Sequence, residues 1–342
     1  MHRHLSRPAR WYRRWYRRWY RRRYRCGLLG AALGLATQSA VAAASPEADN
    51  LASLSIEELG NVRVTSVFKR AARLAAMFVI DADDIRRAGA ASLREALRLA
   101  PHLPVARKSA CEYIVSARGF AGSDGNKMPG LIEGRSVYTP LFSGLFWDTL
   151  DVALDEIERI EVISGPGGTL WGINAVNGVI NVISGSARDS EGGLLSAAAG
   201  NRLRDATLRY GGALGAGGAC RVYAKAFDER HTEDATGLAL DDAWHKAQFG
   251  FRTDWGGDAD QFSLLGEVCH TRKGQPLPGS VQVGIPIDLD SITSSGVNLL
   301  ARWQRTLDAG GKLSVQAYND RTERDVPPAF AETLDILDFQ AQ

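Results

Sequence analysis

The second half of the chain alternates apolar and polar residues in runs of ten or more. The run 205–210 reads Asp-Ala-Thr-Leu-Arg-Tyr, and the run 246–252 reads Lys-Ala-Gln-Phe-Gly-Phe-Arg. Successive side chains of a strand point to opposite faces, so each run predicts a strand with one apolar and one charged face. About eight such runs follow from Glu191, separated by short glycine-rich turns such as 215–218 and by one longer loop, 271–291.

This pattern of alternating strands and turns favours an antiparallel β-barrel that crosses an outer membrane. Long alternating strands, short turns at one end and longer loops at the other are typical of that class. A soluble β-sandwich would alternate too, but strands of this length with Tyr and Trp near their ends favour the membrane. His231, His245 and His270 occur singly on these strands and are interpreted as lumen or rim residues.

The first half predicts shorter elements. A strand is expected at Phe78–Ile80, followed by a helix at 82–88 that Asp81 caps and Gly89 ends. The pattern Ser92-x-x-Glu95 is a capping box that opens a second helix, which stops at Pro101. This half is therefore α+β in character.

Two β-branched strands, Arg159–Ser164 and Val179–Ser184, flank the break Gly165-Pro166-Gly167-Gly168. Their composition suits burial on both faces. A phosphate-binding loop is the obvious enzymatic alternative. It fails because no Lys-Ser/Thr pair follows at P-loop spacing and no Gly-x-Gly-x-x-Gly opens a helix.

This stretch closely resembles the end of the plug domain of TonB-dependent outer-membrane receptors. It contains the E-R-I-E-V strand, the G-P turn, the L-W-G step and the N-G-V-I-N-V-I strand of that family. The matching residues include Glu158, Arg159, Glu161, Gly165, Pro166, Gly168, Trp171, Gly172, Asn177 and Gly178. The family usually has Arg or Lys before Gly-Pro, where this chain has Ser164, so the resemblance implies a weaker tie between plug and barrel.

Two further elements resemble plug motifs. Arg118, Gly119 and Phe120 match an I-x-x-R-G-F element, and Glu133, Gly134 and Arg135 match a D/E-G-R hairpin. Pro129 cannot donate to a sheet ladder, so the strand before that hairpin must start late or bulge. The resemblance implies two loops that face a ligand, with candidates Ser123, Asp124, Asn126, Lys127, Tyr138, Phe142, Phe146 and Trp147. Alternatively, the aromatic residues pack against the barrel wall.

The segment 61–69 reads Asn-Val-Arg-Val-Thr-Ser-Val-Phe-Lys and looks extended. In the family, a segment at this place is the Ton box, which pairs as an added strand with the periplasmic TonB transducer. The candidate residues are Val62, Arg63, Val64, Thr65, Ser66 and Val67. The alternative is an ordinary first strand of the plug sheet.

The N-terminal 44 residues predict an export signal. Residues 26–44 are small and apolar and end in an Ala-x-Ala-type cleavage site, after an unusual Arg, Trp and Tyr-rich tract. Residues 1–44 hold eleven of the 41 basic residues and no acidic one, so cleavage would leave 30 basic against 39 acidic residues. An acidic mature chain argues against nucleic-acid binding. The four cysteines are widely spaced and indicate neither a zinc site nor a disulfide framework.

Together these patterns predict a signal peptide at 1–44, a periplasmic segment with the Ton box at 45–70, an α+β plug domain at 71–186, and an incomplete transmembrane β-barrel at 187–342. The resemblance implies a Gram-negative outer-membrane receptor that takes up a scarce, bulky ligand of the ferric siderophore or cobalamin type. Its partners would be TonB, that ligand and outer-membrane lipid. A surface binding or adhesion protein with a relic plug is the alternative.

No catalytic constellation is visible, so neither an enzyme nor a cofactor is expected. Plugged barrels of this kind have about 22 strands, of which about eight are found here. An open sheet would leave unpaired edges in lipid, where each bare backbone group costs several kcal/mol. We therefore expect a truncated or partial chain that cannot transport a ligand alone.

Overall fold

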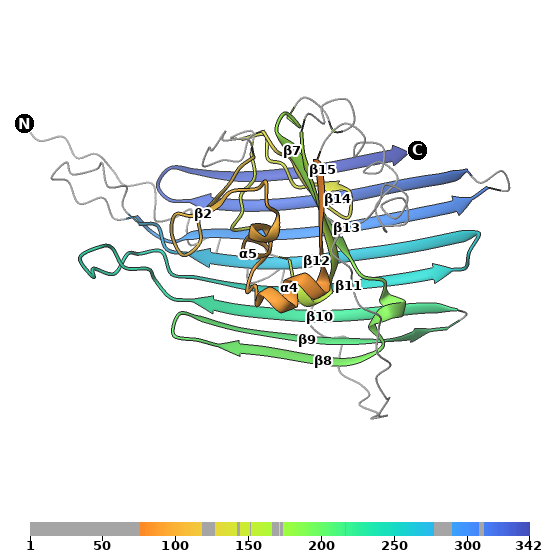
Figure 1. The fold of residues 1–342 in the computed structure, drawn as a ribbon, viewed down its shortest axis with the longest axis horizontal. Coiled ribbons are helices and arrows are strands. Elements are labelled where there is room, and N and C mark those ends of the chain that lie inside the picture. The colour runs from red at the N-terminus through yellow and green to blue at the C-terminus, as the bar shows by residue number, and fades with distance from the viewer. Residues whose placement is uncertain are drawn as a thin grey trace, which may run out of the picture. The chain divides into compact units, whose positions relative to one another are not determined.

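The computed structural model describes residues 76–117, 127–141, 144–150, 152–165, 171, 174–215, 217–276, 289–307 and 311–342. All of them belong to one compact unit that spans Leu51–Gln342. Two parts make up this unit (Figure 1). We refer to residues 76–190 as the plug and to residues 192–341 as the wall.

The plug is built on a five-stranded mixed sheet with the order β1-β6-β7-β4-β5. The pair β4–β7 is parallel and the others are antiparallel. Its strands are β1 (Ala76–Asp81), β4 (Gly130–Ile132), β5 (Arg135–Ser136), β6 (Ile157–Ser164) and β7 (Gly178–Ser184), and a separate hairpin joins β2 (Val105–Arg107) to β3 (Tyr113–Val115). Strand β4 begins directly after Pro129, as the missing N–H of that residue requires.

Short helices connect the plug strands. They are α4 (Ala82–Ala88), α5 (Leu93–Ala96), and the 3₁₀ turns η3 (Leu97–Leu99), η4 (Leu154–Glu156) and η5 (Ala187–Ser190). Asp81 caps α4 in a full capping box, and Gly89 ends the helix in the left-handed conformation. At α5 the Ser92 side chain caps the helix as predicted, but Glu95 accepts from the backbone of Ala91 and not from that of Ser92.

A large apolar core holds the plug together. It contains Ile80 from β1, Leu97 from η3 and Ile160 from β6, none of which is exposed. The β-branched strands β6 and β7 supply most of their apolar residues to this core and to a smaller cluster around Ile163 and Val179. Both faces of these two strands are therefore buried, as their composition predicts.

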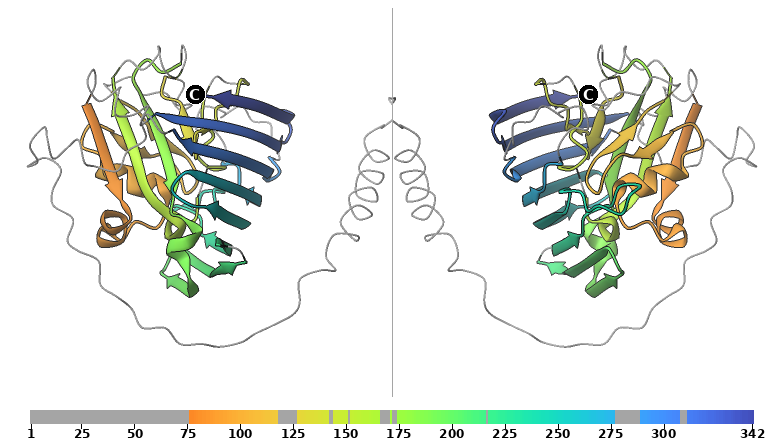
Figure 2. Two further views of the ribbon diagram at one scale, coloured as in Figure 1. Left: turned by 90° about the vertical axis from the view of Figure 1, so that its right-hand side faces the viewer. Right: turned by 90° about the vertical axis from the view of Figure 1, so that its left-hand side faces the viewer.

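The wall is an eight-stranded antiparallel sheet in which every strand pairs with its neighbours in sequence. Strands β8 and β15 are its two edges, and Figure 2 shows the plug elements along one face of the sheet. The strands are β8 (Gly192–Ala199), β9 (Leu203–Leu214), β10 (Gly218–Glu229), β11 (Trp244–Gly256), β12 (Asp260–Lys273), β13 (Ile292–Thr306), β14 (Lys312–Val326) and β15 (Phe330–Ala341).

The face of the wall that turns away from the plug is apolar and exposed. Its side chains include Leu195, Leu208, Tyr210, Val222, Phe249, Phe262, Val268, Val297, Leu299, Leu337 and Phe339. Near the short turns, Trp255, Phe262 and Trp303 are successive cross-strand neighbours, and the rings of the last two are stacked with centroids 6.1 Å apart. The fold class predicted from the sequence, an α+β plug followed by a partial antiparallel barrel sheet, is confirmed.

Candidate functional site: the charged interface of plug and wall

The inward face of the wall carries basic residues on six successive strands. They are Arg209, Arg221, Arg252, Lys273, Arg302 and Arg324, on β9 to β14. Alternation along each strand puts these side chains on the face opposite the apolar one, toward the plug. Carboxylates of the plug meet them there, and three of those carboxylates form the centres of separate clusters.

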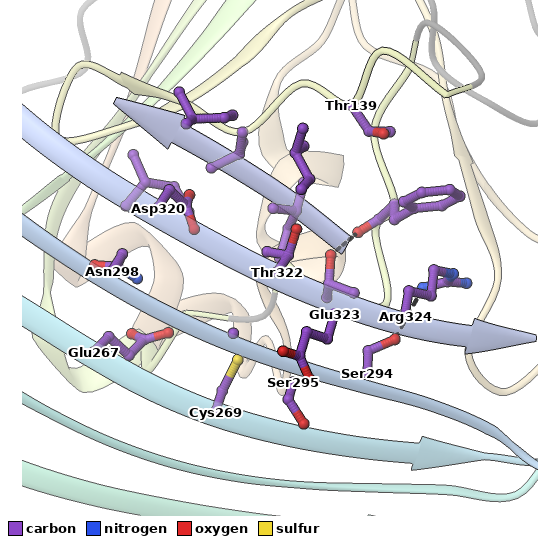
Figure 3. Close-up of a pocket in the computed structure, with 18 of the residues that line it drawn as sticks. Thr139, Glu267, Cys269, Ser294, Ser295, Asn298, Asp320, Thr322, Glu323 and Arg324 are labelled. Atoms are coloured by element: carbon purple, nitrogen blue, oxygen red, sulfur yellow. Dashed lines mark hydrogen bonds between the residues drawn. The ribbon is translucent and has the colours of Figure 1, made fainter. Parts of the chain in front are cut away.

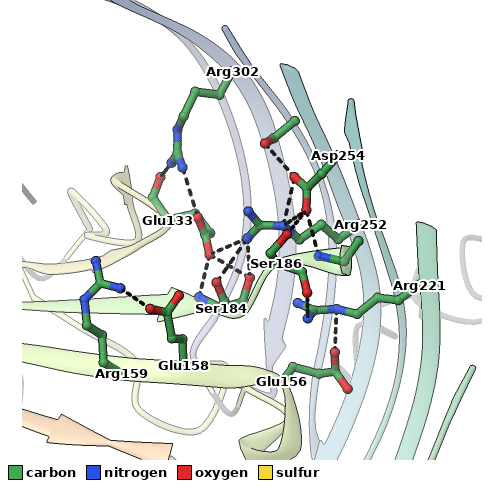
Figure 4. Close-up of polar contacts among 12 residues, drawn as sticks. Glu133, Glu156, Glu158, Arg159, Ser184, Ser186, Arg221, Arg252, Asp254 and Arg302 are labelled. Carbon is green, nitrogen blue, oxygen red and sulfur yellow. Dashed lines mark hydrogen bonds and ion pairs between the residues drawn. The ribbon is translucent and has the colours of Figure 1, made fainter. Parts of the chain in front are cut away.

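Glu133 is the centre of the first cluster (Figure 4). It lies in the β4–β5 turn with a positive φ of 56°, and Gly134 follows at 76°. This turn points the Glu133 carboxylate at Arg252 (3.4 Å) and Arg302 (3.2 Å) of the wall. The backbone N–H and the hydroxyl of Ser184, on plug strand β7, donate to it at 2.6 and 2.7 Å.

Two opposing effects act on this carboxyl group. Burial raises the pKa of Glu133, but the charges of Arg302 and Arg252 and the hydrogen bonds from Ser184 outweigh it. The pKa therefore lies below its usual range, and Glu133 is a buried anion held between plug and wall.

Glu156 is the centre of the second cluster. It ends η4, and its carboxylate lies 2.6 Å from Nε of Arg221 and 3.6 Å from Arg209. Arg221 stands directly opposite Arg252 in the wall, so two guanidinium groups face each other across neighbouring strands. Like charges in that position repel. Glu156 and Glu133 supply the negative charge that offsets this repulsion.

Asp148 is the centre of the third cluster, and it contacts Lys273 at 2.9 Å and Arg324 at 3.1 Å. Burial raises its pKa, but the two cations more than compensate and hold the pKa well below its usual range. The Arg324 guanidinium also lies over the ring of Phe146, 4.1 Å from its centroid. A cation between a carboxylate and an aromatic face is doubly stabilised.

Other contacts have the opposite polarity, with the plug cationic or neutral. Arg135 pairs with Asp320 of β14, and Arg107 pairs with Glu229 of β10. Asp254 of β11 accepts from the Ser186 hydroxyl (3.0 Å) and the Ala187 N–H (2.7 Å) where the plug passes into the wall. These contacts tie the plug to six wall strands, β9 to β14, although Ser164 provides no basic residue at the position where the family usually has one.

The Glu158, Arg159 and Glu161 motif serves the interior of the plug. Arg159 contacts Glu158 at 2.7 Å and Glu161 at 3.0 Å. Glu161 is fully buried, and the Asn181 amide of β7 donates to it at 3.1 Å. This polar network links the two central strands.

Gly178 explains the Asn-Gly step at the start of β7. A Cβ at this position would overlap the carbonyl oxygen of Ile163 on β6, so only glycine permits so close an approach of the two strands. The N–H of Asn177 donates to the Lys127 carbonyl (3.0 Å), and that of Gly165 to the Asn177 carbonyl (2.9 Å). Trp171 packs against the small Ile163 cluster.

The candidate ligand-facing residues have different surroundings. Lys127 is exposed, whereas Trp147 is only 5% exposed and packs in the plug core. Tyr138 and Phe146 line a cavity of about 100 Å³ between the plug and β12–β15 (Figure 3). Polar wall residues of the same cavity are Glu267, Asn298, Asp320 and Thr322.

Several predicted residues lie outside the described part of the chain. They are Val62 to Val67 of the Ton box, Arg118, Gly119, Phe120, Ser123, Asp124, Asn126, Phe142, Pro166, Gly168 and Gly172. Among the described residues, no group of three or more His, Cys, Asp or Glu side chains is placed to hold a metal ion. No helix in the same ranges is long and apolar enough to cross a membrane.

Motif reading identified Glu133 and Arg135 but missed Asp148, Glu156 and all their wall partners. Charge complementarity between the plug and the wall strands could have indicated these residues. Basic residues recur on the polar side of successive wall strands, and a buried cation needs an acid close by. The acids had to come from the plug, but the sequence does not show which acid meets which strand.

Comparison with known proteins agrees with this architecture. Residues 70–179 match the family model described as TonB-dependent Receptor Plug Domain. The chain is 35% identical over 130 residues to the vitamin B12 transporter BtuB of Vibrio vulnificus (strain CMCP6), a match that covers 37% of this chain and 20% of that protein.

Solved structures share the fold at low sequence identity. The ferric-catecholate import receptor Fiu from E. coli K12 has a TM-score of 0.58 at 18% identity, covering 78% of this chain and 44% of that one. The ferric yersiniabactin uptake receptor FyuA from Yersinia pestis gives 0.58 at 17% identity, covering 79% and 46%. The chain thus spans less than half the length of these relatives.

The fold and its charged interface define a plug domain seated against part of an outer-membrane barrel sheet. Residues 70–179 match the TonB-dependent receptor plug domain, and the chain is similar in sequence to a vitamin B12 transporter and in fold to ferric-siderophore uptake receptors.

Proposed function

We propose that this chain forms the plug and part of the barrel of a receptor that takes up a scarce, bulky ligand across the outer membrane. The main support for this proposal is the difference between the two faces of the wall. Its inward face binds the plug through buried ion pairs, and its outward face is apolar. An apolar outer band that ends in aromatic residues suits a lipid environment. Outer-membrane lipid is therefore the proposed surroundings of the wall.

Turn lengths suggest the orientation. On one side of the wall, the turns after β9, β11 and β13 are all short. The other side has short turns after β8 and β14 and the two longer connections, after β10 and β12. Barrels of this kind have short periplasmic turns and longer extracellular loops. The Asp148 cluster, at the ends of β12 and β14 beside the longer loops, then lies toward the cell exterior, and η5 lies toward the periplasm.

The proposed ligand is of the ferric siderophore or cobalamin type, in line with the printed names of the relatives. Energy would come from TonB, paired with residues 62–67. A pull on that segment reaches the plug through β1, an edge strand that pairs only with β6. Peeling β1 away exposes the plug core without first breaking the wall contacts of Glu133 or Asp148.

Uptake is tested in cells that express the protein carrying this chain. Radiolabelled cyanocobalamin and a ⁵⁵Fe-labelled ferric catecholate are offered to cells with and without the transducer. Accumulation that requires the transducer supports the proposal. Surface binding that is unchanged by loss of the transducer, with no accumulation, would contradict it.

The Ton box is tested separately. Cys introduced at Thr65 should form crosslinks with the C-terminal domain of the transducer, because residues 62–67 would pair with it as an added strand. Cys at Ala52, ten or more residues before the segment, is the matched control. Crosslinks from position 52 but not from 65 would refute this assignment.

A further inference from the structure

A second cavity, of about 360 Å³, lies between the plug and the first wall strands. Residues of α5 and the β2–β3 hairpin line its plug side. The β8–β9 turn and the ends of β10 and β11 line its wall side. A cavity needs about 10–15 Å³ to hold one water molecule, so this cavity has room for a small organic molecule. It is separate from the cavity at β12–β15 and from the three ion-pair clusters.

Cations outnumber anions in this cavity. Arg94, Arg107 and Arg202 line it, together with Glu95 and Glu229. Both acids are engaged: Glu229 pairs with Arg107 and accepts from the Trp244 indole at 3.0 Å, and Glu95 accepts from the Ala91 N–H at 3.0 Å. Among the described residues, Arg94 and Arg202 have no carboxylate partner.

The faces of the Arg94 guanidinium are covered, and its Nε edge has no hydrogen-bond partner. The Tyr113 and Trp244 rings lie over it, with centroids 4.7 and 4.5 Å from its central carbon. Its Nη1 donates to the Cys111 carbonyl at 3.3 Å, and its Nε has no partner although the side chain is only 2% exposed. Because the rings occupy the faces, a further partner must approach in the plane.

Arg202, in the β8–β9 turn, also has guanidinium nitrogens without hydrogen-bond partners. Its Nε and one terminal nitrogen, Nη2, are buried and have no hydrogen-bond partner. Nε and a terminal nitrogen of one guanidinium form the fork that binds both oxygens of a carboxylate or phosphate. A buried guanidinium without a partner is costly, so an oxyanion here would be stabilising.

We propose that this cavity binds a small organic oxyanion, a carboxylate or a phosphate, between Arg202 and the in-plane edge of Arg94. The site needs neither the transducer nor transport. Its test can therefore fail while the proposed uptake function stands, and the reverse is also true.

Binding is measured on the purified full chain in a neutral detergent. Citrate and inorganic phosphate are the probes. Equilibrium dialysis of ¹⁴C-citrate and of ³²P-phosphate measures binding directly. Arg202→Gln should weaken binding at least tenfold. Arg204→Gln, two residues further on in β9 and exposed, should leave it unchanged.

Glu95→Gln should increase the affinity for the probes, and a folding defect cannot produce such an increase. The amide oxygen can still accept from Ala91, but the negative charge beside the cavity is lost, so affinity should rise about two- to fivefold. Failure of both probes to bind, or equal binding by the Arg202 and Arg204 variants, would overturn the proposal. If short-chain phosphatidylglycerol displaces bound phosphate but citrate does not, the site would be assigned to a lipid headgroup, and the proposal would be overturned as well.

Discussion

The plug and the wall bury opposite kinds of residues. Ile80, Ile160 and Val162 are shielded inside the plug, whereas Leu208, Phe249 and Leu337 are exposed on the wall. Conversely, Arg221, Lys246 and Lys273 of the wall are almost fully buried. The plug has the buried apolar core of a globular domain. The wall has an apolar outward face, which we propose contacts lipid, and an inward face that contacts the plug, so its stability depends on what covers each face.

The difference shows why the interface is ionic. The inward face of the wall carries most of its charged side chains, because charged and apolar residues alternate in the sequence and successive side chains point to opposite faces. The plug cannot offer an apolar surface to such a face without leaving charges unpaired. It offers carboxylates instead, and these also screen the arginines that oppose one another on neighbouring strands. The predictions below test this division of roles.

The largest effect is expected at Glu133. Glu133→Ala leaves Arg252 and Arg302 without their shared carboxylate and should weaken the plug–wall contact by about 3–5 kcal/mol. Urea titration of the purified chain in detergent, followed by proteolysis of the released plug, measures this. Glu158→Gln, which alters a half-exposed ion pair inside the plug, should have little effect. Equal losses in both variants would contradict this role for Glu133.

The two hydrophobic environments are compared by a matched pair of truncations. Ile160→Ala removes a fully buried side chain and should lower the unfolding free energy of the plug by about 2–5 kcal/mol. Leu208→Ala removes one that is 60% exposed on the outward face, and plug unfolding should change by less than about 0.5 kcal/mol. Near-UV circular dichroism in urea measures both. A large effect of the Leu208 variant on plug unfolding would break the comparison.

Acidification should release the plug. Glu133 and Asp148 have pKa values below those of the unfolded chain, so their stabilisation is fully present above about pH 5 and falls as pH drops below about 4. The urea midpoint of plug release should therefore be flat from pH 7 to 5 and decline toward pH 3. Asp148→Asn should reduce that decline.

Glu156 supplies an internal control for this pH dependence. Burial raises the pKa of Glu156 despite the charges of Arg221 and Arg209, so protonation of this group opposes the decline. Glu156→Gln should therefore leave a slope at least as steep as that of the natural chain. A midpoint that rises on acidification would show that Glu133 and Asp148 do not dominate the interface.

The smallest effect is expected at Ser164. This residue ends β6 between Ala76 and Gly178. Arg here should modestly raise the resistance of the plug to extraction, by less than about 1 kcal/mol, because the existing clusters already tie the plug to the wall. Ser164→Met, which is similar in length but uncharged, is the control. Equal behaviour of the two variants would show that position 164 meets no wall carboxylate.

Short-range patterns in the sequence were enough to define the elements of this protein. Alternation defined the eight wall strands and their two faces, because the period of a strand is two whatever lies around it. The helix at 82–88 was predictable from Asp81 and Gly89, since caps act within one turn. Motifs identified the paired strands β6 and β7 and the Glu133 hairpin.

How these elements meet could not be predicted from such patterns. Asp148 and Lys273 are more than a hundred residues apart, and no local rule selects that pair over the other acids and bases. The burial of Trp147 likewise depended on the plug core that forms around it, not on its aromatic neighbours in sequence. Local backbone and capping preferences act over a few residues, whereas ion pairing and burial depend on distances that exist only once the plug lies against the wall.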